Sequence, residues 1–108
     1  METPLDKLNA KAFAEHLHSN FHTQAGGAKV SLELFSVEER EISPRIELFF
    51  LTFHGPVQPR LAQQIYLLEH EKLGEFSIFL TAVAGDAEGI SYESVFNRMR
   101  KKATGDRP

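Results

Sequence analysis

Three histidines near the N-terminus are the first side chains in this sequence that could bind a metal ion. His16, His18 and His22 lie close together in the chain, with Glu15 beside them. A metal site needs side chains that converge on one point, whereas residues two apart on a helix point about 200° away from one another. We therefore predict that these are surface histidines and that they form no metal site.

Two further histidines could take part in acid–base chemistry. His54 and His70 are expected at strand ends, and the carboxylates of Glu69 and Glu71 flank the second of them. A histidine oriented by a carboxylate can act as a general base, but no Gly-x-Ser-x-Gly turn or other nucleophile context accompanies either residue. We name no catalytic residue and do not expect an enzyme. The alternative is a histidine at a strand edge whose ring hydrogen-bonds a neighbouring backbone group.

The acidic clusters and the glycine pair lack the patterns of known ligand sites. Neither residues 38–41 nor Glu69 and Glu71 show the spacing and glycine of a calcium loop, and Gly26-Gly27 lacks the lysine and hydroxyl residue of a phosphate loop. The chain contains no cysteine, which excludes disulfides and thiolate metal sites. We expect no cofactor and no metal.

The composition is that of an ordinary globular domain. The chain has 108 residues, of which 42% are hydrophobic and 25% charged, enough for one core and too few for two domains. The N-terminus has no basic stretch followed by an apolar run, and no apolar segment approaches the roughly 20 residues of a membrane helix. We expect a cytoplasmic protein that does not contact membranes.

The formal net charge of −3 is unevenly distributed. Residues 98–108 hold five basic residues and one acidic residue, a net +4, which leaves −7 on residues 1–97. We predict a single α+β domain over 1–97 and a flexible basic tail over 98–108. Such a tail could touch nucleic acid or an acidic partner, but the acidic body favours a solvated terminus and argues against nucleic-acid binding.

The segment before residue 20 is predicted to form an amphipathic helix. Thr3, which is followed by a proline, and Asn9 are two possible N-caps. With Asn9 as the cap, Leu8, Ala12, Phe13 and Leu17 repeat at helical spacing. One face of about two to three turns can therefore pack on a sheet.

Alternating apolar and polar residues predict strands in the rest of the chain. The predicted strands span residues 21–24, 30–37, 46–53, 76–83 and 90–96. The alternation changes parity at Leu34 and Phe35, as an extra residue in a β-bulge would cause. The charged residues 38–41 are expected to be a connection, and 46–53, apolar on both faces, the central strand.

Residues 59–73 fit two structures. Helically spaced apolar residues and a capping glycine at 74 favour one helix. The alternative is a short helical turn at 59–63 and then a strand at 64–70 that pairs with 76–83.

Three phrases of the sequence, at residues 49–56, 66–80 and 89–97, resemble an uncharacterised bacterial family of roughly hundred-residue domains of unknown function. The resemblance spans about residues 8–97. It implies a compact antiparallel β-fold with a leading helix, favours a strand at 64–70, and carries no assigned activity. Such domains are often encoded near phage-tail-collar-like proteins, which implies an assembly or accessory role.

The fold expected from these observations is α+β, with the N-terminal helix packed on a bent, mainly antiparallel sheet of five or six strands or on a small barrel. The chain has more phenylalanines than one small core needs to bury. Six of them are therefore expected either in the core or on a surface that a partner covers. These phenylalanines are Phe49, Phe50, Phe53, Phe76, Phe79 and Phe96.

The expected function is a non-enzymatic protein-interaction or assembly module, accessory to a phage-tail-like structure. Its partner would be another protein or a second copy of the chain, as in a homo-oligomer. The alternative is a small barrel that binds an apolar ligand, or a hydrolase. The residues expected at the ligand or partner surface are Phe53, His54, Tyr66, His70 and Tyr92.

Overall fold

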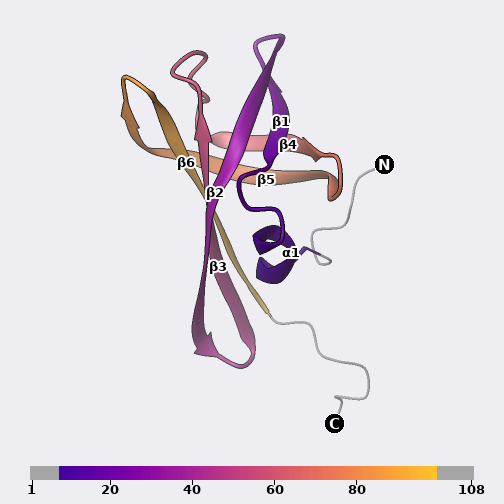
Figure 1. Ribbon diagram of the computed structural model, residues 1–108. Coiled ribbons are helices and arrows are strands. Elements are labelled where there is room, and N and C mark those ends of the chain that lie inside the picture. The colour runs from indigo at the N-terminus through magenta and orange to yellow at the C-terminus, as the bar shows by residue number, and fades with distance from the viewer. Residues whose placement is uncertain (1–7, 100–108) are drawn as a thin grey trace.

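The computed structural model describes residues 8–99, in which one short helix precedes six strands (Figure 1). The helix α1 spans Ala10–Ala14. The strands are β1 (Asn20–Ala25), β2 (Ala28–Ser43), β3 (Ile46–Gly55), β4 (Gln64–His70), β5 (Gly74–Asp86) and β6 (Gly89–Met99). With a helix of only five residues, the domain is mainly β, and the predicted α+β class is corrected accordingly. Within residues 8–99 no helix is long and apolar enough to cross a membrane.

The six strands form one antiparallel sheet that closes on itself. The strand order is β1-β2-β3-β6-β5-β4, and β4 pairs back onto β1 through His22 and Glu69. The chain therefore forms a ring with an inward and an outward face on every strand. The predicted bent, mainly antiparallel sheet is confirmed.

Two predictions concern the long β2–β3 pair, and one of them is confirmed while the other is wrong. The register of β2 shifts between Leu34 and Ser36, so Phe35 is the extra residue of the predicted bulge. The expected connection at 38–41 is instead part of β2, where Glu38 and Arg40 stand opposite Phe50 and Leu48 of β3. This part of the pair projects from the ring at the bottom of Figure 1. Because its side chains on β2 are exposed, the sequence there shows no alternation.

Residues 64–70 form the predicted strand, β4, which pairs with β5 along its length. The helical turn expected at 59–63 is wrong. This segment is an irregular connection without helix, held by its hydrogen bonds to two tyrosines rather than by local helical bonds.

The helix is shorter than predicted. Asn9 is its N-cap, since the N–H of Ala12 donates to Asn9 Oδ1 at 2.9 Å. Beyond α1 the chain turns and enters β1 through His18, whose backbone is left-handed (φ 70°) and whose N–H donates to the carbonyl of Leu34 at 2.7 Å. Leu17, expected on the packing face, is therefore exposed.

Phenylalanine side chains fill the inside of the closed sheet. The ring of Phe13, carried by α1, has its centroid between 5.6 and 6.4 Å from those of four others, Phe21, Phe49, Phe76 and Phe96. Phe53 is also buried, whereas Phe35 and Phe79 are exposed. The excess phenylalanines are thus divided between the core and the surface.

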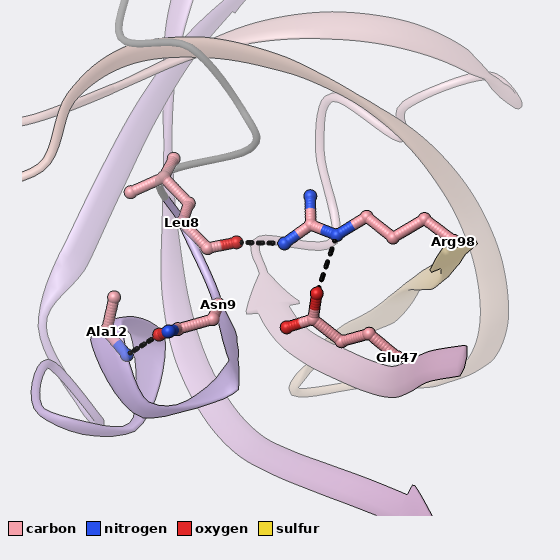
Figure 2. A network of polar contacts seen from close by, with 5 residues as sticks. All are labelled: Leu8, Asn9, Ala12, Glu47 and Arg98. Atoms are coloured by element: carbon pink, nitrogen blue, oxygen red, sulfur yellow. Dashed lines mark hydrogen bonds and ion pairs between the residues drawn. The ribbon is translucent and has the colours of Figure 1, made fainter. Parts of the chain in front are cut away.

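Arg98 was predicted in the basic tail but lies in β6, where its side chain is hydrogen-bonded to the segment that precedes α1 (Figure 2). Its Nε donates to Glu47 Oε1 at 3.0 Å and its Nη2 to the carbonyl of Leu8 at 2.6 Å. Its guanidinium also lies over the rings of Phe49 and Phe96. The remainder of the predicted tail, 100–108, lies outside the described residues.

Candidate functional site

The five residues predicted at a ligand or partner surface are mostly interior. Phe53, Tyr66, His70 and Tyr92 are buried, and only His54 is partly exposed. The predicted residues therefore line the inside of the ring, with His54 on the outside.

The hydroxyl groups of Tyr66 and Tyr92 are hydrogen-bonded to the connection between β3 and β4. The N–H of Leu61 donates to the hydroxyl of Tyr92 at 2.8 Å, and the hydroxyl of Tyr66 donates to the carbonyl of Ala62 at 2.6 Å. Burial, together with the neighbouring Tyr92, raises the pKa of Tyr66 above its ordinary value of 10.0. Tyr66 is thus a neutral donor at physiological pH, and both phenols have a structural role.

His70 lies at the end of β4, and its hydrogen bonds identify its tautomer. The backbone N–H groups of Lys72 and Leu73 both donate to Nδ1, at 3.0 and 3.1 Å. Since Nδ1 accepts, the proton of the neutral ring is on Nε2, which lies 2.9 Å from Ser19 Oγ. His70 therefore caps the turn between β4 and β5, which is the backbone-bonded alternative considered for it.

The Ser19–His70 contact has the wrong direction for nucleophilic catalysis. A serine nucleophile must give its proton to an unprotonated histidine nitrogen. Here the hydroxyl of Ser19 donates to the backbone carbonyl of His16, so Oγ accepts from His70 Nε2–H. The arrangement orders the chain and does not activate a hydroxyl.

His54 lies apart from His70, on the outward face of β3. Its ring stacks on that of Phe35 at the bulge of β2, with centroids 4.1 Å apart and planes 20° apart. It borders a depression of about 330 Å³ that also includes Asp86. The carboxylate of Asp86 accepts from the N–H groups of Glu88 and Gly89, so it caps the β5–β6 turn.

The N-terminal histidines do not converge on a metal site. His18 Nδ1 lies 2.8 Å from Glu33 Oε2 at the surface, whereas the ring of His16 packs against that of His70 with centroids 4.8 Å apart. In the part of the chain that the structure describes, no group of three or more potential ligands could hold a metal ion.

Comparison with known proteins gives the family of the chain. A family model described as Domain of unknown function (DUF6916) matches residues 8–96. The chain belongs to this family. No curated protein and no solved structure matches it. The match begins before α1 and ends within β6, so it comprises the helix, strands β1 to β5 and most of β6.

The DUF6916 domain carries an exposed apolar face outside the ring, on β4, β5 and β6. Ile65, Phe79 and Val95 are 65%, 47% and 51% exposed, and all three border one depression of about 470 Å³. Ile65 stands opposite Phe79, and Val95 opposite the half-buried Phe50 of β3. We call Ile65, Phe79 and Val95 the apolar face.

The sequence pointed to only part of this face. Phe79 was among the phenylalanines assigned to core or surface, but Ile65 and Val95 were not singled out. The sequence signal for this face was a strand that is apolar on both sides. In β4 the exposed Ile65 and Leu67 alternate with the buried Tyr66 and Leu68.

Charges of both signs lie beside the apolar face. Glu93 of β6 stands two residues from Val95 on the same side of the strand, and Arg98, which is paired with Glu47, borders the same depression. Glu69 and Glu75 stand opposite one another four residues from Ile65 and Phe79, where they border a different depression.

Proposed function

We propose that this domain is a protein-interaction module that binds another protein through its apolar face. The observation that carries the proposal is the gathering of Ile65, Phe79 and Val95 around one depression on the outside of the ring. Large side chains gathered on a surface in this way typify interaction sites, where a few central apolar contacts supply most of the binding energy.

The charge of the domain favours a partner different from the chain itself. Glu93 lies two residues from Val95 on the same side of β6, and residues 1–97 carry a formal charge of −7. A second copy would bring like charges together, whereas a protein with an apolar patch bordered by lysine and arginine would complement them. The partner is therefore a protein of that chemistry.

The resemblance noted from the sequence supports an assembly role. It implies genes near phage-tail-collar-like proteins, and a small domain with one exposed binding face suits an accessory component of a phage-tail-like structure. The partner in that case is a structural protein of the particle.

The interior of the ring favours this function over the alternative of an apolar-ligand barrel or a hydrolase. Phe13, Phe21 and Phe76 are fully buried with their rings in mutual contact, where an internal ligand would have to sit. The hydrogen-bond directions at Ser19 and His70 also support binding rather than hydrolysis.

Site-specific photo-crosslinking tests the proposal with a matched control. Phe79 and Phe35 are both 47% exposed, but Phe35 lies at the bulge of β2 outside the apolar face. Each is replaced in turn by a photoreactive phenylalanine in cells that express the natural gene. We expect position 79 to crosslink to one different protein with a basic-rimmed apolar patch, and position 35 not to do so.

Titration of the purified domain with the purified crosslinked partner completes the experiment. Val95→Glu should weaken binding by about thirtyfold or more, as loss of a central apolar contact does. Crosslinks from position 79 to copies of the same chain, with a dimer in light scattering, would replace the proposal by self-association. Identical products from both positions would overturn the apolar face as an interface.

A further inference from the structure

The closure of the ring between β1 and β4 is its shortest strand pairing. There the ladder is reduced to His22 opposite Glu69, whereas β3 pairs with β6 along its whole length. Local opening begins where few backbone hydrogen bonds and packed contacts must be broken. We call this closure the β1–β4 seam.

Three histidines border one depression at the seam. His70 ends β4, His22 lies in β1, and His16 precedes β1 with its ring 4.8 Å from that of His70. All three border a depression of about 430 Å³ that also includes Ser19 and Lys72. Solvent in this depression can therefore bring a proton to the site of His70 without unfolding of the domain.

The closed seam requires a neutral His70. Nδ1 accepts from the N–H groups of Lys72 and Leu73, and Nε2 contacts Ser19 from the segment that leads into β1. A doubly protonated ring has no acceptor nitrogen, so its Nδ1–H would face two N–H donors. The two hydrogen bonds that close the turn after β4 would then be lost. The bond from Nε2–H to Ser19 needs no change of protonation, but the rigid ring must rotate away from the two donors, and this rotation also displaces Nε2–H from Ser19.

We propose that the β1–β4 seam opens when His70 gains a proton at Nδ1, which makes the closed ring a pH-sensitive conformational switch. The proposal stands on the hydrogen bonds of His70 and on the short β1–β4 ladder, and it is independent of the proposed function. Opening leaves β3 paired with β2 and β6, so it separates one seam and not the whole sheet.

The surroundings of His70 mostly oppose its protonation in the closed state. Burial is the main cause that lowers the pKa of His70 below its ordinary value of 6.5, and His16, His22 and Lys72 lower it further, whereas Glu71 raises it. An open seam removes these constraints and restores a pKa near 6.5. The open state therefore binds more protons below pH 6.5, and acid favours it.

His22 gives a second reason for the seam to open. Its Nδ1 is buried and finds no hydrogen-bond partner in the described part of the chain. A buried polar atom without a partner disfavours the closed state, and opening allows water to reach it.

Amide hydrogen exchange measures the opening directly. Protection factors, corrected for the intrinsic exchange rate, are compared at pH 7.5 and pH 5.0 for β1, β4 and the amides of Lys72 and Leu73. We expect the open fraction to rise by up to about thirtyfold, since one proton contributes at most tenfold per pH unit below about 6.5. Amides of the β3–β6 ladder serve as the internal control and should keep their protection.

Two variants separate His70 from the other histidines. His70→Asn retains a side-chain acceptor for the turn but cannot titrate, so its seam protection should no longer depend on pH. His18→Gln, at the exposed pair with Glu33, should behave like the wild type. Should His70→Asn fail to fold, the ring signals of His70 in the wild type must titrate with the same midpoint as the loss of seam protection. Unchanged seam protection at pH 5.0, or a pH dependence that persists in His70→Asn, overturns the proposal.

Discussion

Arg98 in β6 and Glu47 in β3 form an ion pair with 3.0 Å between Nε and Oε1, although they are 51 residues apart in the sequence. Their side chains are only 25% and 11% exposed. The same guanidinium binds the carbonyl of Leu8, so one side chain connects β3, β6 and the segment that precedes α1 (Figure 2).

Arg98→Met should destabilise the domain by about 2–4 kcal/mol. The substitution leaves the Glu47 carboxylate largely buried without its charge partner, and removing one member of such a pair is costly. Urea unfolding followed by circular dichroism measures the free energy of unfolding.

The exposed pair of Arg40 and Glu38 provides the control. It has the same 3.0 Å separation, but its side chains are 58% and 59% exposed, so Arg40→Met should cost less than about 1 kcal/mol. Equal effects of the two substitutions would contradict the buried role of Arg98. Adding Glu47→Leu to Arg98→Met should recover part of the loss, since it removes the unpaired charge.

Phe13→Ala should destabilise the domain by about 3–5 kcal/mol, because it removes the ring that contacts four other rings in the core. Phe79→Ala on the apolar face is the matched control and should cost less than about 1 kcal/mol. Thermal and urea unfolding of both variants measure the difference. A small effect of Phe13→Ala would mean that α1 does not fill the ring.

The elements specified by neighbouring residues were predictable from the sequence. The parity change at Leu34 and Phe35 predicted the bulge that the structure shows at Phe35. The cap at Asn9 likewise depends on contacts three residues apart. Such features leave a local pattern in the chain.

The features that depend on distant residues were not predictable in this way. The seam pairs His22 with Glu69, and the Ser19–His70 contact joins residues 51 apart, so neither leaves a local pattern. Residues 38–41 form a strand whose side chains are exposed, which removes the alternation that identifies strands. Tyr66 and Tyr92 were expected at a ligand or partner surface, but their side chains are buried and their hydroxyls bind the backbone of Leu61 and Ala62, which the local sequence does not indicate.

Tyr92→Phe tests this internal role of the tyrosines. The buried N–H of Leu61 loses its acceptor, and leaving a buried donor unpaired costs about 1–3 kcal/mol. Tyr66→Phe is the matched control. This substitution leaves the carbonyl of Ala62 without its donor, but Ala62 is an exposed residue that water can reach. The loss of unfolding free energy should therefore be smaller. Chemical denaturation measures both, and a larger effect at Tyr66 would contradict this assignment.

Gly89 tests how closely the β5–β6 turn approaches the end of β3. A Cβ atom at Gly89 would lie 2.8 Å from the backbone oxygen of Gly55, so Gly89→Ala must displace a strand end and should cost about 1–3 kcal/mol. At Gly85, in the same hairpin, a Cβ atom meets its nearest neighbour at 3.5 Å, an ordinary contact, and Gly85→Ala should change stability by less than about 1 kcal/mol. Urea unfolding compares the two variants, and backbone amide shifts should show Gly89→Ala displacing residues near Gly55. If both alanines were equally tolerated, the turn would not be held against β3 by this close backbone approach.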